Sequence, residues 1–171
     1  SLIPLIESAQ GVLAAVEIAR CSRRVQCLAF GGADYTLDLD LEWSEDEQEL
    51  AYARATLTHA SRAARIEPPI DSPTIQIRDS DRLRTSAQLA RRMGFQGKLC
   101  IHPEQVACCN EIFMPSAAQI QHAHAVIAAF EQAEAGGSAA LQLDGALIDY
   151  AMVRKARRVL AIAERLSRPH F

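Results

Sequence analysis

Two acidic residues in this 171-residue sequence follow short apolar runs and are spaced to act together. Glu7 comes directly after the run 2–6, and Asp34 follows the run 25–30 by way of Gly31-Gly32-Ala33. Mg²⁺ takes one or two protein carboxylates and fills its remaining positions with water and substrate oxygens. These two residues are therefore candidate magnesium ligands.

The elements expected around them alternate between strand and helix. Buried-strand patterns are followed four times by helical patterns, which predicts a parallel α/β sheet with right-handed crossovers. The carboxyl ends of parallel strands share one edge, and neighbouring strands lie about 4.8 Å apart, so Glu7 and Asp34 should converge. The expected strands are 2–6, 25–30, 70–77 and 97–101, and the helices begin near residues 9, 44, 80 and 103.

Other polar residues fall near the same expected edge. The candidate for the third strand is Asp71, near its start, or Asp79, just after its end; His102 follows the fourth strand, and Lys98 within that strand has no clear role. A histidine at a strand end more often satisfies a local hydrogen bond than abstracts a proton. His102 is therefore expected to line the site.

Local signals mark several helix ends. Ser8 is an expected N-cap, and Gly94 stands where a helix would end in a left-handed residue. Pro103 suits the first position of a helix. Capping-box patterns at 44–47 and 116–119 each predict a helix start.

Each carboxylate also has an ordinary structural interpretation. Glu7 could favour the dipole of its own helix, and Asp34 could form a turn. For a carboxylate directly after an apolar strand, the ordinary structural interpretation is less satisfactory, because an unpaired buried charge costs several kcal/mol. Gly31-Gly32 could make a tight turn or let a substrate approach the backbone.

Composition excludes several protein classes. With 49% hydrophobic and 23% charged residues, the chain is typical of a globular protein, neither collagen-like nor disordered. The seven acids of 38–49 and the six bases of 151–171 are interpreted as solvated faces. The net charge of −3 gives no global attraction for nucleic acid, and no apolar run is long enough for a membrane span. Five cysteines without a C-x-x-C motif indicate a reducing, cytoplasmic location.

Three segments together resemble a known family. They are Pro4-Leu5-Ile6-Glu7-Ser8 with Gly11-Val12, Phe30-Gly31-Gly32-Ala33-Asp34-Tyr35, and residues 94–106 with their Ile101-His102-Pro103 run. They are similar to the citrate lyase β-subunit-like branch of the HpcH/HpaI aldolase superfamily, which is related in chemistry to malyl-CoA and citramalyl-CoA lyases. The resemblance covers nearly the entire chain.

The resemblance implies a fold. A complete (β/α)8 barrel needs about 250 residues, so this chain cannot hold one. The resemblance assigns residues 1–115 to strands five to eight of a TIM barrel, with the metal site, and residues 116–171 to a helical lid or oligomerisation segment. A barrel in this family begins upstream of the metal glutamate, so we expect these residues to belong to a longer natural chain.

The resemblance also implies roles for individual residues. Glu7 and Asp34 would be the protein ligands of Mg²⁺, and Asp149 would be an acid/base delivered to a neighbouring subunit of a homo-oligomer, trimer or larger. Asp149 has an equally good interpretation as the N-cap of the last helix. The residues expected to line the substrate are Gly31, Gly32, Ala33 and His102.

The implied activity is Mg²⁺-dependent carbon–carbon cleavage, or condensation, of a 3-hydroxyacyl thioester of CoA or an acyl carrier, giving an acetyl thioester and a 2-oxo acid. A class II pyruvate aldolase would use the same metal pair without a thioester and would not need Asp149. A catalytically incomplete binding remnant is a third possibility, because residues expected from the earlier strands are absent.

Overall fold

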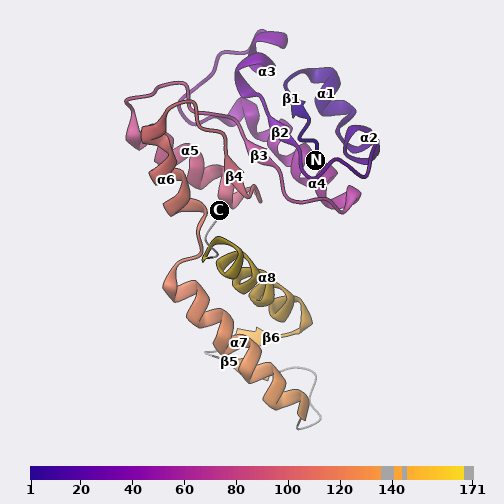
Figure 1. The fold of residues 1–171 in the computed structure, drawn as a ribbon, viewed down its shortest axis with the longest axis vertical. Coiled ribbons are helices and arrows are strands. Elements are labelled where there is room, and N and C mark those ends of the chain that lie inside the picture. Colours follow the sequence, from indigo (N-terminus) through magenta and orange to yellow (C-terminus); the bar gives the residue numbers. More distant parts are fainter. Residues whose placement is uncertain (136–140, 144–145, 168–171) are drawn as a thin grey trace. The chain divides into compact units, whose positions relative to one another are not determined.

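The computed structural model describes residues 1–135, 141–143 and 146–167 of the chain, which forms two compact units. The first is Ser1–Phe113 and the second is Met114–Phe171 (Figure 1).

The first unit contains a four-stranded parallel sheet in which strand order follows chain order. Its strands are β1 (Leu5–Ile6), β2 (Ala29–Phe30), β3 (Ile70–Asp71) and β4 (Gly97–Lys98). Ile6 lies opposite Phe30, and Ile70 lies between Ala29 and Gly97. The predicted half-barrel α/β fold is therefore confirmed, with shorter strands than expected. Within the described sheet, β1 pairs with β2 alone.

Helices follow each strand of this sheet. They are α1 (Ala9–Leu13), α2 (Ala15–Arg20), α3 (Gly32–Asp38), α4 (Ala51–Ala64), α5 (Ser80–Arg92) and α6 (Pro103–Phe113), with a 3₁₀ turn η1 (Gln48–Leu50) before α4. α2 packs on α4 near β1, and α5 packs on α6 near β4 (Figure 1). Leu28, Phe30, Leu50 and Leu57 are fully buried in the core between the sheet and its helices.

Several predicted helix ends are confirmed. The Ser8 hydroxyl accepts a hydrogen bond from the Gly11 N–H at 3.1 Å, and Pro103 begins α6. Gly94 has a φ of +95°, the left-handed region where a side chain is strained. The single helix expected after Ser8 is instead broken at Ala14, which leaves the helical region with ψ at 11°.

The capping box predicted at 44–47 is wrong. Glu49, two residues further on, accepts the hydrogen bond from the Ser44 N–H at 2.8 Å, and α4 begins only at Ala51. Glu47 is buried and has a left-handed backbone with a φ of 54°. The interpretation of 38–49 as a wholly solvated acidic face is wrong at this residue, because Arg54 draws the Glu47 carboxylate inward with a 2.7 Å ion pair.

The second unit pairs two long helices. α7 (Ala117–Ala135) and α8 (Tyr150–Ser167) pack on each other, and β5 (Leu141–Leu143) and β6 (Ala146–Ile148) form an antiparallel pair between them in sequence. The capping box at 116–119 is confirmed by reciprocal hydrogen bonds of 3.0 and 3.2 Å. The shared core consists of Ala123, Val126, Phe130, Val153 and Ala156.

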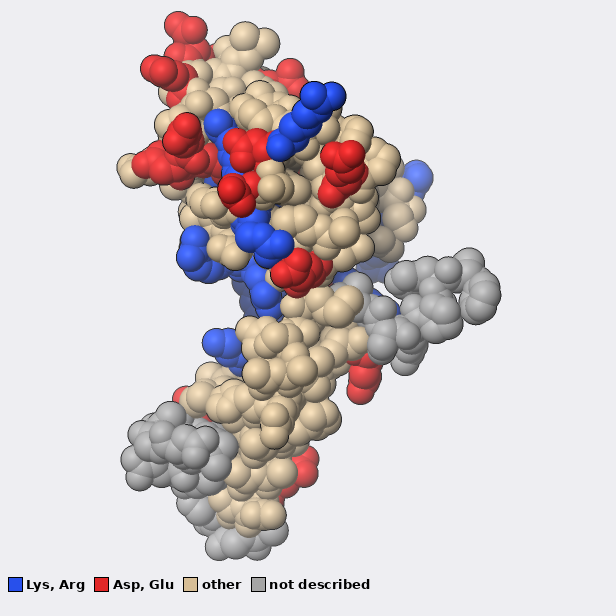
Figure 2. Space-filling view, turned by 90° about the vertical axis from the view of Figure 1, so that its left-hand side faces the viewer, with Lys and Arg blue, Asp and Glu red and all other residues tan. Residues whose placement is uncertain are grey.

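The described surface carries no large region of one charge sign on the face seen in Figure 2. On the first unit, Lys and Arg side chains lie among Asp and Glu side chains, while the second unit is mostly uncharged in this view. None of the described helices is long and apolar enough to cross a membrane.

Candidate metal site

The Glu7 side chain lies against the backbone at Gly31, where the chain leaves the neighbouring strand β2. It is the first residue after β1, it is half-buried, and Gly31 is the first residue after β2. The Gly31 N–H donates to the Ile6 carbonyl at 2.9 Å. A Cβ atom on Gly31 would lie 2.6 Å from Glu7 Cβ and 2.9 Å from Glu7 Oε2. Glycine at position 31 therefore leaves the space that the Glu7 side chain occupies.

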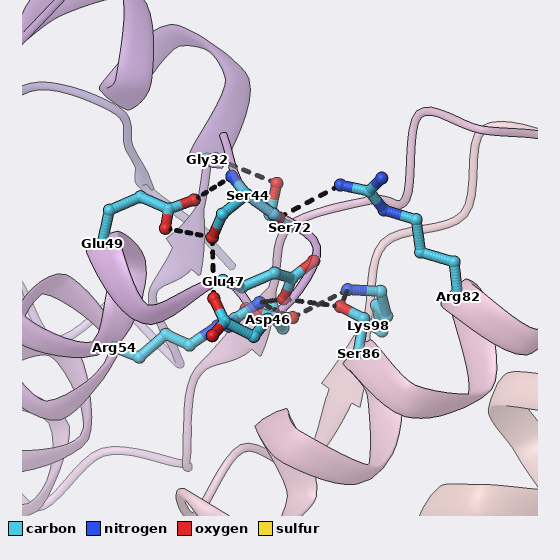
Figure 3. A network of polar contacts seen from close by, with 11 residues as sticks. Gly32, Ser44, Asp46, Glu47, Glu49, Arg54, Ser72, Arg82, Ser86 and Lys98 are labelled. Carbon is cyan, nitrogen blue, oxygen red and sulfur yellow. Dashed lines mark hydrogen bonds and ion pairs between the residues drawn. The ribbon is translucent and has the colours of Figure 1, made fainter. Parts of the chain in front are cut away.

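Gly32 is fixed by the end of the third strand. Its N–H donates a buried 2.9 Å hydrogen bond to the hydroxyl of Ser72, the residue after β3. Figure 3 shows this contact between the two labelled residues. A Cβ on Gly32 would lie 2.9 Å from the same oxygen. The start of α3 is thus held to β3.

Asp34 stands in the first turn of α3, so Gly31 and Gly32 position it as well. Ala33 and Asp34 are exposed, and the Ala33 carbonyl accepts a 2.8 Å hydrogen bond from the Thr36 hydroxyl. Among the described residues, neither Glu7 nor Asp34 has a hydrogen-bond or ion-pair partner for its carboxylate. Both carboxylates are available to a cation.

The donor set fits magnesium better than a metal that needs a full protein cage. Within the described ranges, no group of three or more His, Cys, Asp or Glu side chains is arranged to hold a metal. Two carboxylates at adjacent strand ends would leave most positions to water and substrate oxygens, which is how proteins commonly bind Mg²⁺. The physical basis of this fit is that the carboxylates of Glu7 and Asp34 have no partner among the described residues.

His102 makes the local contacts expected of an ordinary strand-end histidine. Its Nδ1 accepts a hydrogen bond from the Glu104 N–H at 3.3 Å, which favours the tautomer with a proton on Nε2. Buried Gln105 joins the loops after β3 and β4: it donates to the Thr74 carbonyl at 2.8 Å and accepts from the Ile101 N–H at 2.9 Å. The role of His102 toward substrate stays a prediction.

Asp149 is the N-cap of α8. Its Oδ1 accepts a hydrogen bond from the Met152 N–H at 2.9 Å, and the residue is exposed. Tyr150 fixes this end of α8 on α7 through an edge-to-face contact with Phe130 and a 3.1 Å hydrogen bond to Glu134. The capping interpretation is confirmed, and the acid/base role stays a prediction.

A buried charge network, unrecognised from the sequence, lies beside the Gly32–Ser72 contact. It consists of Asp71 together with Glu47, Arg54, Ser86 and Lys98, and the last four are labelled in Figure 3. Arg54 donates to both Asp71 oxygens at 2.9 and 3.0 Å and to Glu47 at 2.7 Å. Lys98 donates to Asp71 and to Ser86, each at 2.8 Å. Two cations thus face two anions, as burial of charge requires.

The charges of the network set each other's ionisation. Burial alone would raise the pKa of the Asp71 carboxyl, but the Lys98 ammonium and the Arg54 guanidinium outweigh burial and lower that pKa. Burial alone would lower the pKa of Arg54, but Asp71 and Glu47 raise it. Since Ser72 follows Asp71 directly, the network also holds the residue that fixes Gly32.

Of the two acids considered after the third strand, Asp71 joins this network and Asp79 does not. Asp79 caps α5 by accepting the Arg82 N–H at 2.9 Å. The sequence indicated Asp71 and Lys98 as candidate site residues, since each lies at a strand end. No feature of the sequence pointed to Arg54, because a single arginine in a helix gives no indication that it is buried.

The fold and the site define the class of protein: a parallel α/β half-barrel with one unpartnered carboxylate directly after β1 and another in the first turn of α3, which begins at the Gly31-Gly32 turn. The HpcH/HpaI aldolase/citrate lyase family matches residues 1–103, and the chain belongs to that family.

The relatives and one solved structure agree with this membership. The β subunit of citrate lyase from Leuconostoc mesenteroides subsp. cremoris is 38% identical over 162 residues, which cover 95% of this chain and 53% of the relative. The L-malyl-CoA/β-methylmalyl-CoA lyase of Rhodobacter capsulatus is 33% identical, over 96% of this chain and 57% of that enzyme. The Mycobacterium tuberculosis CitE protein, solved with magnesium, acetoacetate and coenzyme A, has a TM-score of 0.79 at 25% identity, covering 95% of this chain and 60% of its own. The chain therefore spans little more than half the length of these proteins.

Proposed function

We propose that the protein containing this chain is a Mg²⁺-dependent carbon–carbon lyase. Its substrate would be a 3-hydroxyacyl thioester such as citryl-, malyl- or citramalyl-CoA, or the same acyl group on a carrier protein, and its products an acetyl thioester and a 2-oxo acid. The observation that carries the proposal is the unpaired Glu7 carboxylate held against Gly31. Membership of the family supports it.

Glu7 and Asp34 would hold Mg²⁺, which when bound would neutralise negative charge on the oxygens of the 2-oxo acid portion. The magnesium and coenzyme A in the solved CitE relative support both the metal and the thioester. As the family resemblance implies, Gly31, Gly32 and Ala33 would line the substrate, and the exposed Ala33 would present only a methyl group. His102 would line it with the Nε2–H that its Nδ1 hydrogen bond favours.

Asp149 would handle the proton. Breaking the bond between the carbinol carbon and the α-carbon of the thioester leaves an electron pair on the α-carbon, which must take up a proton, while the carbinol hydroxyl gives up its own proton to solvent as its oxygen becomes the 2-oxo group. Asp149 would donate that proton in cleavage and remove it in condensation. The family resemblance implies that a neighbouring subunit supplies this residue, so we also propose a homo-oligomer, trimer or larger, working in the cytoplasm.

Two alternatives make different predictions for one variant. Asparagine caps a helix as well as aspartate does, so Asp149→Asn keeps the cap of α8 while removing the acid. In this variant, a lyase that acts on thioesters should lose turnover while its helicity stays unchanged. A class II pyruvate aldolase should keep its turnover. A catalytically incomplete remnant should show no cleavage with or without the substitution.

The deciding experiment is an assay of the complete natural protein on citryl-, malyl- and citramalyl-thioesters, with Mg²⁺ and with chelator. We expect cleavage of at least one thioester, loss of cleavage in chelator, and recovery when Mg²⁺ is restored. Cleavage that is unaffected by chelator would contradict the metal assignment. Turnover of free 2-oxo acid aldols alone would favour the aldolase.

A further inference from the structure

Two thiols lie close together outside the metal site. The sulfur of Cys100, in the loop between β4 and α6, is 3.6 Å from the sulfur of Cys109 on α6. Cys100 is an exposed residue, and Cys109 is buried. All five cysteines of the chain are free thiols in this structure. The proposed lyase chemistry uses none of them.

We propose that Cys100 and Cys109 are a redox-active pair that forms an intrachain disulfide when the protein meets a peroxide. The Cys100 sulfur would attack the peroxide, break its O–O bond and become a sulfenic acid, releasing one water or alcohol. The Cys109 sulfur would then attack the Cys100 sulfur and form the S–S bond. The hydroxyl leaves with the Cys109 proton as a second water, so two thiols are oxidised and one peroxide is reduced.

Exposure and ionisation assign the order of these steps. Cys100 can meet a peroxide from solvent, while Cys109 is shielded by the packing of α6. Burial, with the hydrogen bond from Cys100, raises the pKa of Cys109 to about 12. Because the thiolate is the reactive form, Cys109 does not react first with the oxidant. Its sulfur lies 3.6 Å from that of Cys100, so it is placed to act as the resolving thiol and to give up its proton as the hydroxyl of the sulfenic acid leaves.

The local geometry allows the bond to form. An S–S bond is about 2.05 Å long, so the sulfurs must approach by roughly 1.5 Å. Cys100 stands in a loop, two residues after buried Lys98, whose carbonyl lies 3.8 Å from the Cys100 sulfur. A rotation of the Cys100 side chain with a small loop adjustment would bring the sulfurs together. The link would tie the loop that contains His102 to α6.

The test is to treat the full chain with hydrogen peroxide and to measure its mass without reductant. We expect the loss of two hydrogen atoms, reversed by dithiothreitol. A protease that cleaves after glutamate separates Cys100 from Cys109 at Glu104, whereas trypsin has no site between residues 99 and 153. The linked peptides should appear only without reductant.

Serine variants identify the partners. Cys109→Ser and, separately, the exposed Cys100→Ser should each abolish the intrachain link, and agreement between them guards against misfolding of the buried variant. Cys108→Ser, which changes the neighbouring thiol, and Cys21→Ser, which changes an exposed thiol elsewhere, should both keep the link. A link through Cys108, disulfides only between chains, or no loss of hydrogen from the wild-type chain would overturn the proposal.

Discussion

Glu7 and Gly31 are in direct contact at the exits of two neighbouring parallel strands, with a 2.6 Å separation between Glu7 Cβ and the position of a Cβ on Gly31. Contacts this short are not tolerated, so any side chain at position 31 must displace Glu7 or the strand exit. This contact makes the orientation of a candidate metal ligand depend on a residue that has no side chain of its own.

Gly31→Ala should therefore weaken metal binding by about 10- to 100-fold, the loss typical of substitutions that disturb the orientation of metal ligands. The measurement is a titration with Mn²⁺, followed by electron paramagnetic resonance, in competition with Mg²⁺. Gly97→Ala is the matched control, because no atom lies within 4 Å of a Cβ at that position. Equal affinities in the two variants would show that Gly31 does not position the ligand.

Ser72→Ala should destabilise the chain, because it leaves the buried Gly32 N–H without its acceptor. An unsatisfied buried donor costs about 1–3 kcal/mol, and the free energy of unfolding from urea titration should fall by that amount. Ser80→Ala removes an exposed hydroxyl at the start of α5 and should leave the urea midpoint unchanged. A midpoint for Ser72→Ala equal to that of the control would argue against this anchor.

Asp71→Asn should be more damaging, because it leaves Arg54 and Lys98 buried with only one anion, Glu47. Removing one partner of a buried ion pair typically costs about 3–5 kcal/mol. The exposed pair of Arg84 with Glu111 is the control, and Arg84→Ala should hardly move the urea midpoint. The idea fails if the two substitutions have the same effect.

Acid should destabilise the first unit through the same carboxyl. The pKa of Asp71 is lowered in the folded chain, so the unfolded chain binds more protons as the pH approaches its ordinary value of about 3.9. The contribution of Asp71 to stability is therefore full above about pH 5 and is lost as the pH falls through the folded pKa, below about 4. Urea titrations across this range should show a falling free energy of unfolding, with a weaker dependence in Asp71→Asn. A stability that rises with acidification would reverse the assigned sign.

Local signals in the sequence predicted the elements well where one residue decides the conformation. Ser8 accepts an N–H within its own first turn, Pro103 fixes its own φ, and Gly94 adopts a left-handed backbone that other residues avoid. Each needs no knowledge of distant parts of the chain. The neighbouring positions of Glu7 and the Gly31-Gly32 turn followed from the parallel order of the first two strands.

The charge network could not be predicted in this way. Glu47 stands in an acidic run and in a capping-box pattern, both of which favour an exposed side chain. Its burial depends on Arg54, which pairs both with Glu47 and with Asp71, a residue 17 positions further along the chain. Side chains that come from separate elements have no regular spacing in the sequence, so the folded structure is needed to identify the network.

Mg²⁺ binding by Glu7→Gln and Asp34→Asn, measured by competition with Mn²⁺, tests directly whether these two residues are the metal ligands. Neither carboxylate has a partner within the described ranges, so both variants should keep wild-type stability while losing at least about tenfold in affinity. Glu45→Gln, an exposed acid in the run 38–49, should bind as the wild-type chain does. Wild-type affinity for Mg²⁺ in a chain that carries both Glu7→Gln and Asp34→Asn would contradict the assignment of these residues as metal ligands.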